Sequence, residues 1–83
     1  MYYVYIIESI SNKKYYTGCT NNLKRRLKEH DNGLSRYTKT GRPWILKYKE
    51  CFNILSEARK RESQIKAWKK RSAIEKLISA AIV

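Results

Sequence analysis

Three polar residues, Arg26, His30 and Glu62, lie on or beside the apolar stripes of two predicted helices, where a polar side chain needs a partner. Glu62 follows Ala58 by four residues and precedes Ile65 by three, so helical spacing turns its carboxylate toward the core. An unpaired buried charge costs several kcal/mol, so a cation is expected opposite this carboxylate. The alternatives are a metal ion, an ion pair with Arg26, and a partly exposed position at the edge of the stripe.

Arg26 and His30 are four residues apart and therefore share one face of the first predicted helix, at the margin of a stripe formed by Leu23 and Leu27. A guanidinium group binds two phosphate oxygens at once, and an imidazole beside it accepts or donates a proton near neutral pH. The ordinary alternative is that both side chains are simply solvated at a helix edge. The pattern alone leaves both interpretations open.

Tyr5 and Tyr16 lie on the two arms of a predicted β-hairpin, where a suitable register would turn both phenols to one face. A tyrosine with the ordinary pKa of about 10 is only about 0.1% phenolate at neutral pH. Such a side chain acts as a base only where neighbouring cations lower its pKa. The sequence contains many cations that could do so.

The hairpin is predicted from composition. Residues 2–8 are nearly all aromatic or β-branched, as in a strand buried on both faces. A polar turn over residues 11–14 leads to a second strand over residues 15–17, which Gly18 is expected to end. The two tyrosines are therefore held by regular structure.

A helix capped by Thr20 or Asn21 is predicted to follow the hairpin and to end near His30. Residues 33–43 contain several cations together with glycine and proline, and they predict an exposed basic loop. Loops of this kind often carry function. This loop is therefore a candidate contact surface.

The second half of the chain predicts one strand and two helices. Residues 44–52 alternate as in a strand with one wet face. A helix is expected from Ser56 to about Lys70, and a capping box formed by Ser72 and Glu75 predicts a third helix. The expected fold is α+β, with a three-stranded antiparallel sheet flanked by helices in the order ββαβαα.

The chain is strongly basic, because nineteen Lys and Arg residues face seven Asp and Glu residues, giving a formal net charge of +12. So much like charge on a small surface repels itself, and an anionic partner relieves that repulsion. Nucleic acid is the commonest such partner, and the alternatives are an acidic protein, an anionic membrane and a ribosomal component. The charge predicts a partner and leaves the chemistry open.

The length of 83 residues leaves room for one core, so we expect a single domain over residues 1–83, with a motif core over about 2–71 and a C-terminal helix over about 72–82. No apolar run reaches the roughly 20 residues that span a bilayer, and the N-terminus lacks the charged region of a signal peptide. We therefore expect a cytoplasmic protein without a membrane partner. The sequence leaves the oligomeric state open, with a monomer slightly favoured.

Cys19 and Cys51 are far apart in the sequence, and the chain has one histidine. These are too few soft ligands for a zinc site. In a cytoplasmic protein both cysteines are expected to be free thiols.

Three segments together resemble the GIY-YIG endonuclease superfamily: residues 3–5 (Tyr-Val-Tyr), residues 16–18 (Tyr-Thr-Gly) and the helix motif of residues 19–30. The resemblance covers nearly the whole chain, from residue 2 to about residue 71. It includes the loop over residues 36–38 and the end of the second helix. Within the superfamily the chain is similar to the small stand-alone bacterial branch, the UPF0213-like proteins, which are related to the N-terminal nuclease domain of UvrC.

The chain departs from the motif pattern at two positions. Tyr3 stands where the first motif has glycine, and Thr17 is the middle residue of the second motif. Gly18 is the motif glycine that remains. These departures leave the expected fold unchanged.

The resemblance implies a role for each residue singled out above. Glu62 is similar to the family's metal-binding carboxylate, which holds Mg²⁺ or Mn²⁺, and Arg26 is similar to the arginine that holds the scissile phosphate. Tyr5 and Tyr16 match the motif tyrosines, one of which deprotonates or orients the attacking water. His30 matches a position that assists the base.

Resemblance and charge together predict a metal-dependent endonuclease acting on nucleic acid, DNA favoured over RNA, in repair, recombination or turnover. We expect no fused recognition domain, so the cations should bind phosphates and few side chains should contact base edges. The expected cleavage is therefore selective for structure or weakly selective for sequence. The alternatives are a nucleic-acid-binding module with little or no activity and a basic accessory protein for an acidic partner. The residues expected to contact nucleic acid are Lys24, Arg25, Arg36, Tyr37, Lys39, Arg42 and Lys66.

Overall fold

A three-stranded antiparallel sheet forms the centre of the computed structural model, which describes residues 1–34 and 36–81. Its strands are β1 (Tyr2–Ser9), β2 (Tyr15–Thr20) and β3 (Trp44–Phe52), in the spatial order β2-β1-β3. β1 is the middle strand, and its residues 4–7, whose side chains alternate between the two faces of the sheet, are all buried. This confirms the predicted strand that is buried on both faces.

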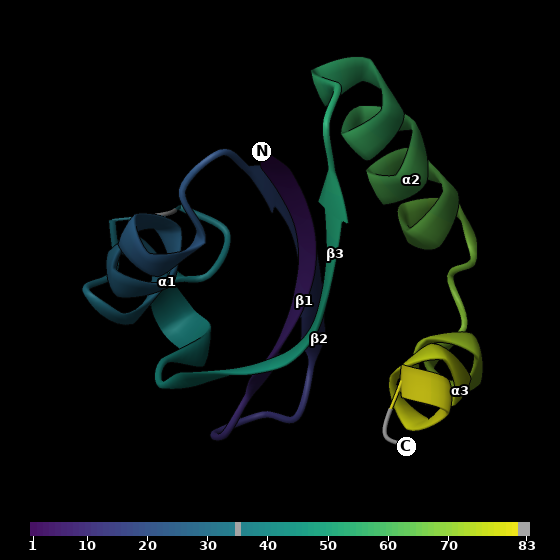
Figure 1. The fold of residues 1–83 in the computed structure, drawn as a ribbon. Helices are drawn as coiled ribbons and strands as arrows, with labels where there is room; N and C mark the ends of the chain where they lie inside the picture. Colours follow the sequence, from purple (N-terminus) through teal and green to yellow (C-terminus); the bar gives the residue numbers. More distant parts are fainter. Residues whose placement is uncertain (35, 82–83) are drawn as a thin grey trace.

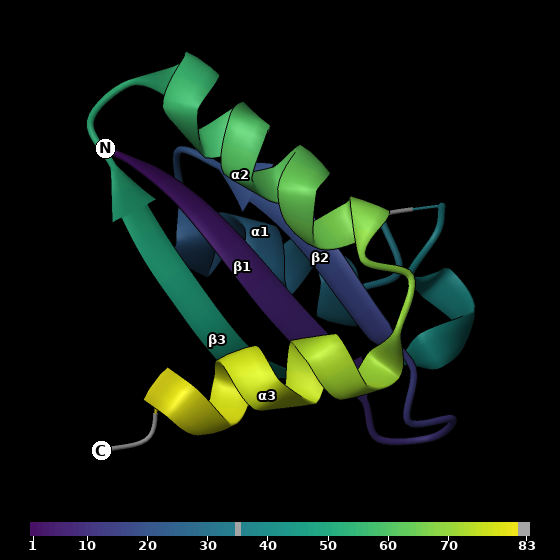
Figure 2. The same cartoon turned by 90° about the vertical axis from the view of Figure 1, so that its right-hand side faces the viewer.

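Helices cover both faces of this sheet, as Figure 1 shows. One face is covered by α1 (Leu23–Asp31), and the other by α2 (Leu55–Ala67) and α3 (Arg71–Ala81), which lie in front of the strands in Figure 2. The predicted single α+β domain with the order ββαβαα is confirmed. The buried residues of the main core lie between the sheet and the last two helices: Val4, Ile6, Ala58, Ile65 and Ile78.

The pairing of β1 with β2 decides which side chains share a face. Tyr5 pairs with Gly18, and Ile7 pairs with Tyr16. Residues directly opposite each other point to the same side, and the side repeats every two residues along a strand. The register therefore turns Tyr5 and Tyr16 to the same face, where both contact His30 of α1.

The start of α1 differs from the prediction. Its capping residue is Asn22, whose Oδ1 accepts a hydrogen bond from the N–H of Arg25 at 3.1 Å. Neither Thr20 nor Asn21 caps the helix. The reason is that Thr20 still belongs to β2, where it pairs with Tyr3.

The ends of α2 and α3 also differ from the prediction. α2 begins at Leu55 and ends at Ala67, before the predicted end near Lys70, and Lys69 has a left-handed φ of 54° that turns the chain. α3 begins at Arg71, so Ser72 lies inside its first turn and the predicted capping box is wrong. The predicted end of this helix at residue 82 lies outside the described residues.

Two further expectations need correction. Gly18 does not end β2, which continues to Thr20 because Gly18 pairs with Tyr5. The loop over residues 33–43 is not wholly exposed, since it contains a short 3-10 helix, η1 (Lys39–Gly41), and buries Thr38 and Gly41. This loop folds against the sheet, and its inner side belongs to the candidate site.

Both cysteines are free thiols, as predicted. They lie on the two strands that flank β1, because Cys19 is opposite Val4 and Cys51 is opposite Tyr3. The middle strand separates them. Among the helices of the described residues, none has the length and apolar character needed to cross a membrane.

Candidate active site

A chain of hydrogen bonds links Tyr5, His30 and Thr38 on the α1 face of the sheet. The phenol oxygen of Tyr5 lies 2.7 Å from Nε2 of His30, and Nδ1 of His30 lies 2.6 Å from Oγ1 of Thr38. The exposed fraction is 1% for Tyr5 and 0% for the other two residues. His30 is therefore a buried, hydrogen-bonded residue, and its interpretation as a solvated residue at a helix edge is wrong.

Burial keeps both titratable members of this chain neutral at physiological pH. It raises the pKa of Tyr5 to about 12, against the opposing effect of the nearby Arg26 guanidinium. Burial and the charge of Arg26 lower the pKa of His30 to about 4. Nearby cations thus do not suffice to make Tyr5 a phenolate, so any proton transfer from it needs an acceptor in contact.

The lowered pKa of His30 predicts a pH-dependent stability. A histidine in the unfolded chain titrates near pH 6.5, so below about that pH the unfolded chain binds a proton that the folded chain excludes. The free energy of unfolding should therefore be highest above about pH 6.5 and fall by up to about 3 kcal/mol as the pH is lowered toward 4.

Urea unfolding of the wild type and of His30→Gln across this pH range measures the effect. The difference between the two proteins isolates the histidine from the carboxylates that also titrate at low pH. A wild type that loses no more stability than the variant between pH 7.5 and about 4.5 would contradict a buried neutral histidine.

Gly18 permits the position of the Tyr5 ring. A Cβ atom at Gly18 would lie 2.4 Å from the phenol oxygen of Tyr5 and 2.5 Å from Cζ, far inside contact distance. The ring of Tyr5 therefore lies across Gly18 and reaches toward the edge of the sheet, because β2 is an edge strand. The motif glycine thus has a steric reason at this position.

Gly18→Ala should destabilise the protein by about 1–3 kcal/mol, because the added methyl group forces Tyr5 away from His30. Urea unfolding is the measurement. Cys51→Ala is the matched control, since it also places alanine in a strand but at an exposed position, and it should change stability by less than about 0.5 kcal/mol. Equal stability of Gly18→Ala and wild type would exclude this steric role.

Arg26 lies beside the buried hydrogen-bonded side chains of Tyr5 and His30, and its own side chain remains accessible to solvent. Its Nη1 donates to Oε1 of Glu29 at 2.9 Å, and 30% of its side chain is exposed. Arg26 is also near enough to Tyr5 to lower its pKa in part. The alternative in which Arg26 pairs with Glu62 is wrong, because Glu29 is its partner.

Glu62 approaches the edge strand β2 from the α2 face of the sheet, opposite to the face that carries Tyr5 and His30. Its Oε2 lies 2.9 Å from Nζ of Lys66, one turn further along α2. Nζ of Lys66 lies 5.9 Å from the centre of the Tyr16 ring, and that ring packs against His30 with 5.2 Å between ring centres. A continuous series of contacts therefore runs around β2 from Glu62 to Lys66, Tyr16, His30 and Tyr5.

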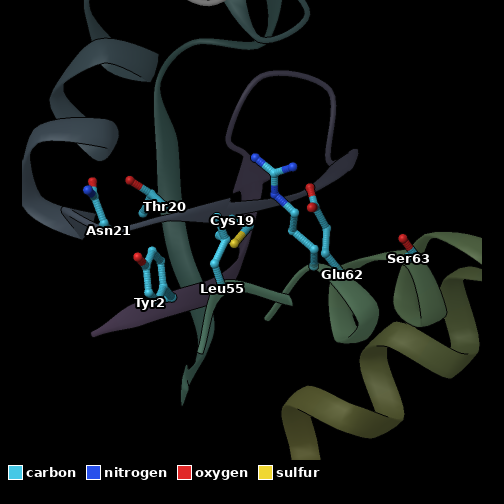
Figure 3. Close-up of a pocket in the computed structure, with 8 residues that line it drawn as sticks. Tyr2, Cys19, Thr20, Asn21, Leu55, Glu62 and Ser63 are labelled. Carbon is cyan, nitrogen blue, oxygen red and sulfur yellow. The ribbon is translucent and has the colours of Figure 1, made fainter. Parts of the chain in front are cut away.

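Glu62 borders an open pocket of about 560 Å³ on the α2 side of β2. Figure 3 shows Tyr2 and Asn21 toward one end of this pocket and Glu62 toward the other. The side chain of Glu62 is 20% exposed. It lies at the partly exposed edge of the α2 stripe. Helical spacing had predicted that this carboxylate points into the core, and that prediction is wrong.

The donors around Glu62 fit one kind of metal ion. Within residues 1–34 and 36–81, no three His, Cys, Asp or Glu side chains are grouped so as to hold a metal. A lone carboxylate beside solvent suits Mg²⁺ or Mn²⁺, which keep several waters and take further oxygen ligands from phosphates. It does not suit zinc, which needs three or four protein ligands.

The residues predicted to contact nucleic acid are distributed over four places. Lys66 adjoins Glu62, and Arg25 lies on α1 with 65% of its side chain exposed. Lys24 lies apart, in a separate pocket that it shares with Tyr3 and Lys49. The remaining four are exposed in the loop that carries Thr38: Arg36, Tyr37, Lys39 and Arg42.

Sequence reasoning did not single out two residues of this site. Arg59 lines the pocket beside Glu62 and precedes it by three residues on α2, a spacing that is visible in the sequence. Thr38 contacts His30 from a loop. No helical or strand periodicity relates Thr38 to His30, so the basic composition of the loop and its resemblance to the family pattern pointed to the segment but not to this contact.

Comparison with known families gives the class of protein to which this fold belongs. Residues 1–76 match the GIY-YIG catalytic domain, and the chain therefore belongs to the GIY-YIG family. Domains of this family have a nuclease fold and typically use a divalent metal ion.

Several relatives are UPF0213 proteins. One from Syntrophus aciditrophicus is 48% identical over 77 residues, covering 90% of this chain and 84% of its own length. Another from Staphylococcus haemolyticus is 40% identical over 75 residues, covering 89% of this chain and 90% of its own length. The solution structure of a UPF0213 protein from Bacillus halodurans is similar with a TM-score of 0.62 and 34% identity, over 98% of this chain and 86% of that one.

Proposed function

We propose that this protein is an endonuclease that hydrolyses phosphodiester bonds of nucleic acid, DNA in preference to RNA, with one Mg²⁺ or Mn²⁺ ion at Glu62. The observation that carries the proposal is the continuous series of contacts around β2 from Glu62 to Tyr5. It joins a candidate metal ligand on one face of the sheet to a candidate proton acceptor on the other. A phosphate at the edge of β2 would lie between them.

Tyr5 and His30 act as a proton relay in this proposal. The phenol oxygen of Tyr5 accepts a proton from the attacking water while its own proton passes to Nε2 of His30, 2.7 Å away. Tyr5 stays neutral throughout, so its pKa of about 12 does not oppose the reaction. General base catalysis of this kind contributes about 10²–10⁴ in rate.

In this proposal Arg26 binds the phosphate of the substrate, and Glu62 holds the metal ion beside it. The partly exposed guanidinium of Arg26 binds its oxygens, for which a planar fork of donors is suited. When bound at Glu62, a divalent ion supplies Lewis-acid stabilisation of the charge that develops on the phosphate and the leaving oxygen. Because Lys66 already neutralises this carboxylate, metal binding without nucleic acid should be weak.

The basic surface explains the expected partner and its limited selectivity. The net charge of +12 attracts a polyanion, and the exposed cations of the loop over residues 36–42 grip its backbone. Such contacts position the substrate and carry little sequence information. We therefore propose cleavage that is selective for structure or weakly selective for sequence.

Two observations favour a second candidate, a nucleic-acid-binding module of low activity. Tyr5 is 1% exposed, and Glu62 is already paired with Lys66, so both must change contacts before a reaction. The charge and the exposed cations would serve such a module equally well.

Cleavage of labelled single-stranded, duplex and branched DNA and of RNA separates these candidates. Each substrate is incubated with Mg²⁺, with Mn²⁺ and with excess chelator, and binding is measured in parallel. The expected result is cleavage in the presence of metal ion and no cleavage with excess chelator. Tight, salt-sensitive binding without cutting of any substrate would favour the binding module, and absence of binding would exclude both.

A further inference from the structure

We propose that Thr38 is a positioning residue that holds His30 in the tautomer with a proton on Nδ1, leaving Nε2 free to accept the proton of Tyr5. Its catalytic meaning rests on the proposed nuclease function. The hydrogen-bond arrangement itself does not, because it belongs to the protein without substrate.

The position of Thr38 supports this role. Its side chain is completely buried, and Oγ1 lies 2.6 Å from Nδ1 of His30. Thr38 is also the N-cap residue of η1, where a threonine hydroxyl commonly accepts a backbone N–H. Here the side chain makes no capping bond, and its oxygen contacts the imidazole instead.

The hydrogen-bond needs of Tyr5 choose between the two tautomers of a neutral His30. The phenol of Tyr5 is 1% exposed, so its O–H proton needs an acceptor within the protein. Among the described residues, the acceptor within hydrogen-bond distance of the phenol oxygen is Nε2 of His30. Nε2 must then lack a proton, so Nδ1 carries it and donates to Oγ1 of Thr38.

The loop around Thr38 is held firmly enough to orient a ring. The indole Nε1–H of Trp44 donates to the carbonyl oxygen of Thr38 at 2.7 Å, and Oγ of Ser9 donates to the carbonyl of Gly41 at 2.6 Å. A Cβ atom at Gly41 would lie 2.4 Å from the Trp44 ring, so the indole packs directly on the backbone of η1. The loop that presents candidate nucleic-acid contacts is thus also the loop that orients the proton acceptor.

Nitrogen NMR of the wild type without substrate tests the tautomer directly. His30 is the single histidine of the chain, so its two ring nitrogens give one unambiguous pair of signals. Near pH 7 we expect the shift of a protonated nitrogen at Nδ1 and of an unprotonated one at Nε2. Protonation at Nε2 instead would overturn the proposal whether or not the protein cuts nucleic acid.

Thr38→Val and Thr38→Ser test the role of the hydroxyl. Valine keeps the shape and removes the acceptor, so the Nδ1-protonated tautomer should lose population and kcat should fall about 10- to 100-fold with KM nearly unchanged. Serine restores the hydroxyl and should recover both the tautomer and most of kcat. Thr40→Val, a matched change at an exposed residue of η1, should alter neither.

The outcomes distinguish this proposal from the proposed function. If wild type shows the expected tautomer but cuts no substrate, the nuclease function fails and the positioning by Thr38 stands. If wild type cuts and Thr38→Val keeps the wild-type tautomer and kcat, the function stands and Thr38 has no positioning role.

Discussion

Glu62→Gln should lower metal-dependent cleavage by at least about a thousandfold while leaving the fold intact. Loss of a metal ion that stabilises the transition state by several kcal/mol corresponds to about three powers of ten in rate. Glutamine keeps the shape of the side chain and removes the charge that attracts the ion. The mutation also breaks an ion pair with Lys66, whose side chain is 51% exposed, so the free energy of unfolding should change by less than about 1 kcal/mol.

The measurement combines cleavage at saturating Mg²⁺ or Mn²⁺ with urea unfolding. Glu57→Gln is the matched control, because Glu57 is an exposed glutamate in the first turn of α2 and does not line the pocket. It should cleave like the wild type. A Glu62→Gln protein that loses stability but retains cleavage would make Glu62 a structural ion-pair partner and remove the metal site from the proposal.

Tyr5→Phe should lower kcat by about 10²–10⁴, because the relay loses the oxygen that accepts the proton of water. The substitution also leaves Nε2 of His30 buried without a donor, which costs about 1–3 kcal/mol of stability. Binding of nucleic acid should change little, since Tyr5 is buried and many exposed cations carry the electrostatic attraction.

Tyr16→Phe tests whether the structure distinguishes the two motif tyrosines. Tyr16 contacts His30 through the edge or face of its ring, and phenylalanine preserves that contact. Its loss of kcat should therefore be smaller than that of Tyr5→Phe. Single-turnover cleavage of a labelled substrate, with anisotropy as the measure of binding, compares the two variants, and a larger loss for Tyr16→Phe would transfer the proton-accepting role to Tyr16.

Much of the architecture follows from patterns that depend on neighbours along the chain. The aromatic and β-branched run of residues 2–8 predicted a strand buried on both faces, and the alternation of residues 44–52 predicted one with a wet face. The ends of the helices were predicted less well. Thr20 and Ser72 both have suitable capping chemistry, yet one belongs to β2 and the other lies inside α3.

The residue types and the motif spacing in the sequence determined which side chains were candidates, but only the tertiary structure decided their surroundings. Arg26 and His30 share one margin of α1, yet the fold leaves Arg26 30% exposed and buries His30 completely between Tyr5 and Thr38. Glu62 meets Lys66 and an open pocket. The physical reason is that secondary structure depends mainly on local propensity and periodicity, whereas burial, pKa and hydrogen-bond partners depend on segments that are distant in sequence and meet only on packing.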